Sequence, residues 1–258
     1  MKFIKIKPEG GCGICGYIWQ VLRAIYHNPS KKYYIDFETC IYKDSSVSEN
    51  NVWNYYFKQP HVDVSPDPTE IEKTVGIIDE EVSEFRFNYL KNPTLEVIRD
   101  IRLKYNDIIK KYIVLQPDLQ KKIDNYIEEN FKGKKVLGLH LRGTDHPDKK
   151  TMKEYMPIIK NKLKNYDYLY VSSDEEYRYK FVKAVFGEKV ITYNSIKSID
   201  DKPLHHSKRE PNYQYKIGED VIIESYLLSK TDFLLCFSNS NVNFLSRCLS
   251  PDLEFLAL

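Results

Sequence analysis

Short apolar segments alternate with longer amphipathic segments throughout the second half of the chain, and this order constrains the fold strongly. Apolar runs of four to eight residues are typical of buried strands, and apolar residues three or four positions apart indicate helices. Strands separated by helices form parallel sheets that are covered on both faces. We therefore predict an α/β fold. The predicted elements are strands at 136–141, 168–172, 189–193, 232–237 and near 255, helices at 151–164, 175–186, 219–229 and 239–249, and a polar loop at 194–218.

The first half opens in the same way, with a strand, a glycine-containing turn at 8–13 and a helix. The segment 44–68 is rich in polar residues and proline and predicts no regular element. We place a domain boundary after residue 131, which divides the chain into domains 1–131 and 132–258. The predicted elements of the first domain are strands at 2–7 and 32–37, and helices over 14–25, 93–112 and 117–130.

Charge and hydrophobicity exclude several classes of function. The formal net charge is +2 over 258 residues, so attraction to nucleic acids or membranes through bulk electrostatics is not expected. No segment approaches the roughly 20 apolar residues that span a bilayer, and the polar start lacks the apolar core of a secretion signal. We therefore expect a cytoplasmic protein with no membrane span and no nucleic-acid partner.

The chain has five cysteines without regular spacing, which argues against a disulfide framework and fits a reducing compartment. Cys12 and Cys15 form a Cys-x-x-Cys pair that could belong to a redox or zinc site. A zinc site needs two further soft ligands, whereas Cys40, Cys236 and Cys248 stand singly in apolar segments where burial is expected. The chain also has no Asp-x-Asp motif, so we expect no metal site.

The segment His140-Leu-Arg142-Gly-Thr144-Asp145 stands where a predicted buried strand ends. In open α/β sheets, ligands bind at that edge. The Arg142 guanidinium group is a fork-shaped donor suited to phosphate oxygens, and it keeps its charge at physiological pH. The segment therefore predicts a site for a phosphorylated ligand. His140 could hydrogen-bond a base or ribose, and a histidine buried in the core is the alternative.

Polar residues follow two further predicted strands. Ser238, Asn239 and Ser240 lie between a strand and the helix after it, so their amides and hydroxyls are expected at the same edge as Arg142. Helix N-termini attract anions by about 0.3 to 1 kcal/mol per charge, so this turn and Arg142 together could clamp a diphosphate. Helix capping is the alternative. Asp174 is expected either to contact the same ligand or to cap a helix.

Two carboxylates, Glu224 and Asp220, stand on a predicted helix that otherwise presents apolar residues to a core. A carboxylate can accept paired hydrogen bonds from adjacent N–H groups, which guanine offers and adenine does not. Both residues are therefore candidates for recognising a guanine base. The alternative for each is a solvated charge on the helix surface.

The glycines of Gly11-x-Gly13-x-x-Gly16 follow a predicted strand and open a helix, and Asp36 stands at the end of the next strand. This spacing matches a dinucleotide-binding fingerprint, so an NAD-dependent oxidoreductase is an alternative function. However, Pro8-Glu9 separates the strand from the glycines more than that turn usually allows. The fingerprint also leaves the strand-end arginine unexplained.

Taken together, these motifs resemble the GDP-fucose-dependent fucosyltransferases, which include the core α1,6, nodulation, α1,2 and protein O-fucosyltransferase branches. Residues 140–145 are similar to the family's His-x-Arg-x-Thr-Asp motif, and residues 10–16 are similar to its glycine-rich opening. Residues 224–241 contain an acidic residue, a Leu-Ser pair, an apolar strand and a Ser-rich turn in the family's order. The resemblance implies two Rossmann-like domains facing across a cleft, which is the GT-B type of glycosyltransferase.

The resemblance also implies a reaction, namely inverting transfer of a sugar, in the first place L-fucose, from GDP-fucose to a hydroxyl of an acceptor glycan. No metal ion or other cofactor is implied. Domain 132–258 would bind the GDP-sugar, and domain 1–131 would face the acceptor. Glu224 matches the family's acidic residue linked to guanine recognition. The glycine loop with Gly11 and Gly13 would face the diphosphate, and Thr144 would belong to the same donor site.

The catalytic candidates are Arg142, Asp145 and Asp148. In the core α1,6 branch a glutamate follows the Thr-Asp pair by several residues, and Lys150 stands at that place here. Asp145 or Asp148 would then have to act as the general base. This departure leaves the acceptor and the linkage open, and it keeps an inactive sugar-nucleotide-binding protein as an alternative. A transferase that uses another GDP-hexose is a further alternative.

The segment 44–68 contains Trp53, Tyr55 and Tyr56, whose rings could stack on the face of an acceptor sugar. Packing in the core is the preferred expectation, because aromatic side chains bury large areas. Other acceptor contacts are expected from domain 1–131, where no motif identifies them.

Overall fold

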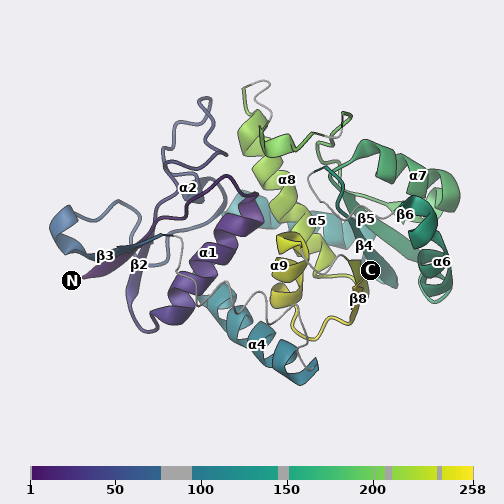
Figure 1. The fold of residues 1–258 in the computed structure, drawn as a ribbon, viewed down its shortest axis with the longest axis horizontal. Coiled ribbons are helices and arrows are strands. Elements are labelled where there is room, and N and C mark those ends of the chain that lie inside the picture. The colour runs from purple at the N-terminus through teal and green to yellow at the C-terminus, as the bar shows by residue number, and fades with distance from the viewer. Residues whose placement is uncertain are drawn as a thin grey trace. The chain divides into compact units, whose positions relative to one another are not determined.

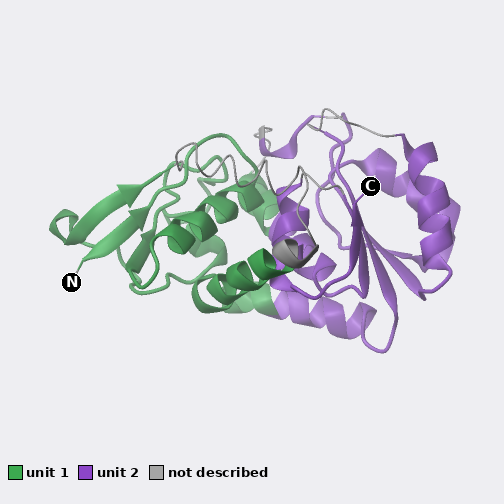
Figure 2. Cartoon of the chain, turned by 60° about the horizontal axis from the view of Figure 1, so that its bottom comes forward, with its two compact units in different colours: residues 1–120, 210–219 green, residues 121–209, 220–258 purple. Residues whose placement is uncertain are grey.

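The computed structural model describes residues 2–76, 95–144, 151–200, 202–206, 211–236 and 240–257 (Figure 1). The chain divides into two compact units, which Figure 2 shows in two colours. The first unit comprises residues 1–120 and 210–219, and the second comprises residues 121–209 and 220–258. The donor and acceptor roles assigned to domains 1–131 and 132–258 stay predictions.

The first unit contains a parallel sheet in the order β2-β1-β3. After β1 the chain runs through the glycine segment 7–13 into α1, most of whose residues are buried. Helix α4 packs against α1, and the rings of Trp19 and Tyr105 lie 5.0 Å apart between their centroids. The elements are β1 (Phe3–Ile6), α1 (Ile14–His27), β2 (Lys32–Ile35), α2 (Trp53–Tyr56), β3 (Ile71–Val75) and α4 (Leu95–Tyr112).

Two of these elements lie where the sequence predicts none. The central residues of β3 are exposed, so this strand lacks an apolar run; it forms by pairing with β1 at one edge of the described sheet. Helix α2 is a single turn, and it brings three rings into the core. Trp53 and Tyr56 are fully buried and Tyr55 is nearly so, which confirms core packing for these aromatics.

The second unit contains a parallel sheet in the order β6-β5-β4-β7-β8, which confirms the α/β prediction. The chain runs from β4 through β5 to β6 on one side and continues with β7 and β8 on the other. Ligands of such sheets bind outside the carboxyl ends of the strands at the point of reversal, here between β4 and β7. The strands are β4 (Val136–Leu141), β5 (Tyr168–Ser173), β6 (Val190–Ile191), β7 (Phe233–Cys236) and β8 (Phe255–Ala257).

The core of the second unit lies between its sheet and the helices α6 (Met152–Leu163) and α7 (Glu176–Phe186), which cover one face (Figure 1). Leu137, Leu139 and Leu141 of β4 point into this core. Because side chains alternate across a strand, the residues between them point to the opposite face. That face meets α5 (Pro117–Asn130) and α8 (Tyr213–Leu228), and α9 (Asn241–Leu249) follows β7. In the described part of the chain, no helix combines the length and apolar character that a membrane crossing requires.

Helix α8 corrects the sequence prediction, because it starts at Tyr213 and not at residue 219. The backbone N–H groups of Gln214 and Tyr215 donate to Asp44 Oδ2, at 3.1 and 3.2 Å, and that of Asn212 donates to Asp44 Oδ1 at 3.2 Å. Unsatisfied amides at a helix start need such an acceptor. A residue about 170 positions away supplies it, so no local motif could reveal the true start of the helix.

Candidate functional site

Arg142 is partly exposed and directly follows the fully buried strand β4. Its turn is held by Asp174, which follows the neighbouring strand β5. The N–H group of Gly143 donates to Asp174 Oδ1 at 2.8 Å, and the Thr144 hydroxyl donates to Asp174 Oδ2 at 2.9 Å. One carboxylate therefore binds the two residues that follow Arg142 and holds their turn in place.

The charge of Asp174 is balanced by its surroundings. Burial raises the pKa of Asp174, while the hydrogen bonds from Thr144 and Gly143 and the nearby Arg142 guanidinium group oppose that rise. Asp174 does not cap α7, because the cap position of that helix is Glu175. The structure thus gives Asp174 a supporting role for the Arg142 turn, and its contact with a ligand stays a prediction.

His140 lies on β4 and is 5% exposed. Its register partner on β5 is Ser172, and both side chains belong to the face of the sheet opposite the Leu139 core. His140 is therefore a buried histidine one strand away from the carboxylate site described next. Its contact with a base or ribose stays a prediction.

Glu224 of α8 is a buried carboxylate at the same level of the sheet. Ser172 Oγ donates to Glu224 Oε2 at 3.0 Å, and Ser195 Oγ donates to Glu224 Oε1 at 2.6 Å. Burial raises the pKa of Glu224 to about 7, although the Lys197 ammonium group and the Ser195 hydroxyl act in the opposite direction. Asp220 is buried as well and accepts from the N–H group of Ile196 at 2.9 Å. Neither carboxylate is a solvated surface charge.

Four supporting residues escaped the sequence analysis. Ser172 is the second-last residue of β5, and Ser195 and Lys197 lie in the loop after β6. Lys197 Nζ donates to Ser195 Oγ at 2.9 Å. Glu175 contacts the Arg142 turn from the start of α7. Ser172 and Glu175 stand at or just after the end of β5, so a survey of polar residues at every strand end would have identified these two. Ser195 and Lys197 lie further along the loop after β6, where no such signal marks them.

The predicted site also includes the turn between β7 and α9, of which the structure describes only Ser240. Ser240 is the N-cap residue of α9, its side chain makes no capping hydrogen bond, and it is 1% exposed. Its hydroxyl has no hydrogen-bond partner among the described residues. Ser238 and Asn239 lie outside the described residues, as do Asp145 and Asp148.

The glycine loop of the first unit is held by side chains from α1 and from the segment after β2. Gln20 Nε2 donates to the Glu9 carbonyl at 2.9 Å, and the N–H group of Glu9 donates back to Gln20 Oε1 at 3.0 Å. The first amide of α1, on Ile14, donates to the Tyr42 hydroxyl at 3.0 Å. The contact of Gly11 and Gly13 with a diphosphate stays a prediction.

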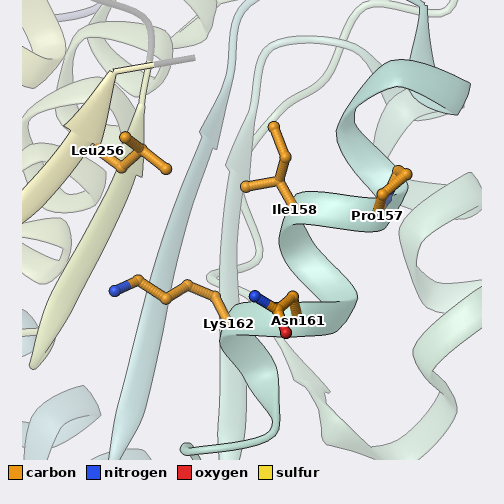
Figure 3. Close-up of a pocket in the computed structure, with 5 residues that line it drawn as sticks. All are labelled: Pro157, Ile158, Asn161, Lys162 and Leu256. Carbon is orange, nitrogen blue, oxygen red and sulfur yellow. The ribbon is translucent and has the colours of Figure 1, made fainter.

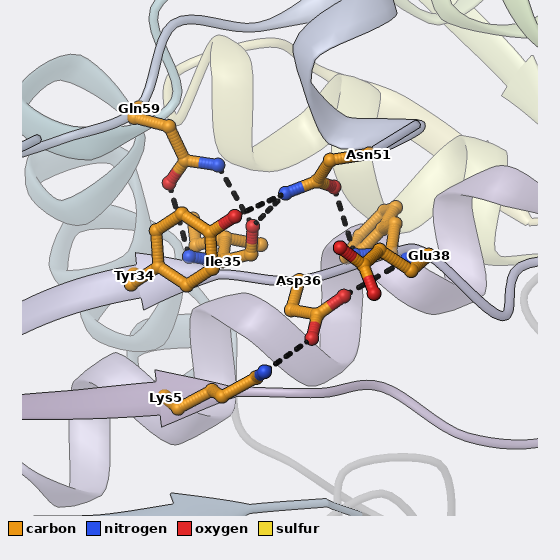
Figure 4. A network of polar contacts seen from close by, with 8 residues as sticks. Lys5, Tyr34, Ile35, Asp36, Glu38, Asn51 and Gln59 are labelled. Carbon is orange, nitrogen blue, oxygen red and sulfur yellow. Dashed lines mark hydrogen bonds and ion pairs between the residues drawn. The ribbon is translucent and has the colours of Figure 1, made fainter. Parts of the chain in front are cut away.

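Asp36, the acidic residue of the dinucleotide fingerprint, is occupied by the protein itself (Figure 4). Lys5 Nζ lies 2.7 Å from Asp36 Oδ2, and the N–H group of Glu38 donates to Asp36 Oδ1 at 2.9 Å. Asp36 is 2% exposed. A fingerprint carboxylate must instead reach ribose hydroxyls, so this geometry weighs against an NAD site.

The cysteines lie as expected for structural residues. Cys40, Cys236 and Cys248 are buried, and all five cysteines are free thiols. Among the described residues, no group of three or more His, Cys, Asp or Glu side chains is arranged to hold a metal ion.

A surface hollow of the second unit lies away from the predicted site residues (Figure 3). It is formed by α6 and β8, and none of the residues discussed above lines it. Lys162 places its ammonium group 3.6 Å from the centroid of the Phe233 ring. The lining residues are Pro157, Ile158, Asn161, Lys162 and Leu256.

The chain matches no protein-family model and no curated protein sequence. It is similar in structure to the NodZ α1,6-fucosyltransferase from Bradyrhizobium. In the crystal soaked with GDP-fucose, the TM-score is 0.60 at 17% identity over 97% of this chain and 94% of that one. In the crystal grown with GDP, the TM-score is 0.59 at 16% identity over 97% and 93%.

A second similar structure is a mutant of Arabidopsis thaliana FUT1 in complex with GDP, with a TM-score of 0.56 at 10% identity over 96% of this chain and 69% of that one. These likenesses concern the fold. They agree with the fold that the resemblance implies and with the parallel α/β sheets described above. The facing of two domains across a cleft stays a prediction.

Proposed function

We propose that this chain is a glycosyltransferase that moves L-fucose from GDP-fucose to a hydroxyl group of an acceptor glycan, with inversion at the anomeric carbon. The observation that carries the proposal is the meeting of Arg142 and the Glu224 site at the carboxyl edge of one parallel sheet. The register pairs Leu141 with Ser173 and His140 with Ser172, so Arg142, which follows β4, lies at the same edge as Ser172 of β5, which binds Glu224. The likeness in fold to fucosyltransferases crystallised with GDP supports it.

Arg142 would stabilise the departing diphosphate. In sugar transfer, the anomeric carbon gains positive character while negative charge builds on the leaving group. A fixed donor aimed at that charge lowers the barrier, and removing one such donor in other enzymes costs about 2.7 to 4 kcal/mol. The hydrogen bonds from Gly143 and Thr144 to Asp174 hold the turn in place before the ligand binds, so little reorganisation is needed.

Glu224 would recognise the guanine base. An ionised carboxylate has about four acceptor sites, and the Ser172 and Ser195 hydroxyls use two of them. Adjacent N–H groups of guanine can occupy the remaining sites. With a pKa of about 7, Glu224 is poised between its neutral and ionised forms, and paired donors favour the ionised form.

The other donor contacts of the proposal come from residues at the same strand ends and from the glycine loop. His140 and Thr144 would contact the base, ribose or phosphate, and the turn ending at Ser240 would add amides at the start of α9. The general base of the proposal is Asp145 or Asp148. A cytoplasmic location and independence of metal ions also remain parts of the proposal. The complete set of proposed donor-site residues is Gly11, Gly13, His140, Arg142, Thr144, Asp174, Glu224, Ser238, Asn239 and Ser240.

Three alternatives differ from this proposal in what the chain would bind or do. A transferase for another GDP-hexose and an inactive sugar-nucleotide-binding protein would both use the same donor site. An NAD-dependent oxidoreductase would use the glycine loop and Asp36, and the Lys5 to Asp36 ion pair argues against it.

Thermal unfolding with a panel of ligands separates these alternatives. The panel contains GDP, GDP-fucose, GDP-mannose, UDP, NAD⁺ and NADH, each with and without EDTA. A ligand at a hundred times its Kd adds about 2.7 kcal/mol, which raises the Tm by several degrees for a chain of this size. We expect stabilisation by GDP compounds that EDTA does not abolish. Stabilisation by NAD⁺ or NADH alone would contradict the proposal.

A second measurement separates an active transferase from a binding protein. Release of GDP from GDP-fucose is followed with and without a mixture of glycan acceptors, and the Arg142→Ala variant is the control. Acceptor-dependent release that the variant lacks supports transfer. Tight GDP binding without release from any GDP-hexose would establish the inactive alternative.

A further inference from the structure

A buried ion pair lies beside the Arg142 turn. The Nε atom of Arg178 donates to Oε2 of Glu175, and the two side chains are only 7% and 6% exposed. Burying an ion pair costs desolvation free energy that its attraction often fails to recover. Such a pair is therefore weak evidence for a stabilising role, and its position suggests a different one.

The Glu175 carboxylate occupies the space where residue 143 would carry a side chain. A Cβ atom built on Gly143 would overlap Glu175 Oε1, Oε2 and Cδ. The described glycines with a positive φ are Gly10, Gly133 and Gly187, so the backbone angle does not explain the glycine at position 143. Close approach of the carboxylate does explain it, since only glycine leaves room for this contact.

The segment that carries Glu175 is fixed on both of its sides. Asp174 binds the turn at Gly143 and Thr144, as described above. On the other side, the N–H group of Ser198 donates to the Asp174 carbonyl at 2.8 Å, and that of Glu176 donates to the Ser198 carbonyl at 3.0 Å. The Glu175 backbone therefore cannot move away from the turn without breaking these bonds.

Two consecutive carboxylates beside a site for a diphosphate would repel it unless their charges were balanced. Asp174 has the Arg142 guanidinium group nearby. Glu175 lies against the residue next to Arg142 and would compete for the same guanidinium group if it had no partner of its own. Arg178 supplies that partner from one turn further along α7.

We infer that Glu175 and Arg178 are positioning residues for Arg142. Glu175 packs against Gly143 and thereby fixes the conformation of the turn. Arg178 neutralises Glu175, so that Arg142 remains available to a diphosphate. The inference rests on the proposed function, because the role of Arg142 is to bind the diphosphate of a nucleotide. Neither residue is expected to touch the substrate.

The test compares Arg178→Met with Lys180→Met. Lys180 pairs with Glu176 on the same helix at 3.0 Å, but that pair is exposed, at 68% and 38%. We expect Arg178→Met to weaken GDP binding roughly 10- to 100-fold, by analogy with the loss of affinity when residues that orient metal ligands are removed. Binding of guanosine, which has no phosphate, should stay unchanged, and Lys180→Met should leave both ligands unaffected.

The double variant Glu175→Gln/Arg178→Met keeps the inference testable if a single variant is unstable. It removes both charges, so Arg142 is no longer drawn to an unpaired carboxylate, and GDP affinity should return most of the way toward that of the original protein. An equal loss of GDP and guanosine binding in Arg178→Met would indicate a merely structural role and would overturn the inference. Unchanged GDP binding would overturn it as well.

Hydrogen exchange distinguishes failure of this inference from failure of the proposed function. If the unmodified protein binds neither GDP nor guanosine, the proposed function is wrong. The Gly143 and Thr144 amides are then still expected to exchange faster in Arg178→Met than in Lys180→Met, because the turn loses its support. Equal exchange in the two variants would show that the ion pair does not hold the turn.

Discussion

The hydroxyl of Ser195 lies 2.6 Å from Oε1 of Glu224, and this bond joins the loop after β6 to helix α8 inside the second unit. On the other side of the carboxylate, Ser172 bonds to Oε2. Both of these donors are neutral, and the cation of the cluster, Lys197, donates to Ser195. Glu224 is thus a buried carboxylate held by hydroxyl groups, which is why burial dominates its pKa.

Guanosine binding should depend on the ionisation of Glu224. The ionised form accepts the paired N–H groups of guanine, so affinity should rise between pH 6 and pH 8, by about tenfold for a pKa near 7. Guanosine is the suitable probe because it has no phosphate that titrates in this range. Calorimetric titration at pH 6, 7 and 8 measures the effect.

Two variants control this experiment. Glu224→Gln should bind guanosine weakly and without dependence on pH. Ser195→Ala removes a hydrogen bond that favours the ionised carboxylate, so it should move the midpoint of the pH profile upward. A guanosine affinity that is the same at all three pH values would exclude Glu224 as the base-recognising group.

The stability of the unliganded protein should also depend on Glu224. Because its pKa is raised in the folded state from 4.5 to about 7, its contribution to stability is complete below pH 4.5 and is lost as the pH rises to about 7. The loss is on the order of 3 kcal/mol. Relative to the original protein, Glu224→Gln should therefore gain stability from pH 4.5 to 7 and level off above. Parallel unfolding curves for the two proteins over this range would disprove the assignment.

Arg142→Ala should reduce turnover by roughly a hundredfold or more, because it removes a donor to the developing charge on the diphosphate. Arg142→Lys should retain part of the activity, since it keeps the charge but loses the two-pronged geometry. The rate of GDP release with saturating GDP-fucose measures both variants. A near-normal rate in Arg142→Ala would refute the role of this residue.

Asp44→Ala should destabilise the first unit by about 1 to 2 kcal/mol, because the amides at the start of α8 lose their acceptor. Thermal unfolding measures the loss, which corresponds to a few degrees in Tm. Asp67→Ala is the matched control, since Asp67 accepts from the Thr69 amide at the exposed start of a short helix, Pro68–Glu70. Equal effects of the two variants would mean that burial of the Asp44 cap adds nothing.

The alternation of short apolar runs with amphipathic segments predicts the parallel sheet of the second unit correctly, because these strands are buried on both faces and their residue pattern records it. The same reasoning does not find β3, whose central residues are exposed and whose pairing with β1 alone makes it a strand. It also places the start of α8 six residues late, since the cap comes from Asp44.

The candidate site, too, could be predicted from the sequence only in part. The strand-end position of Arg142 follows from the sequence, because a buried strand must end where charged and polar residues begin. The support of that arginine does not follow from it. Asp174 is a candidate from the sequence, but its hydrogen bonds to the turn and the contact of Glu175 with Gly143 follow only from the pairing of β4 with β5.

Residue types and their periodicity therefore establish the fold class of this chain, the strand ends at which its candidate site lies and the charged residue, Arg142, at one of them. These features depend on local composition and on which faces of each segment avoid water. The protonation of Glu224, the use of Asp36 as an internal ion-pair partner and the supports of the Arg142 turn depend on the tertiary structure. These three features arise from contacts between residues that are far apart in the chain. A short stretch of sequence does not show which groups such contacts bury or join by hydrogen bonds.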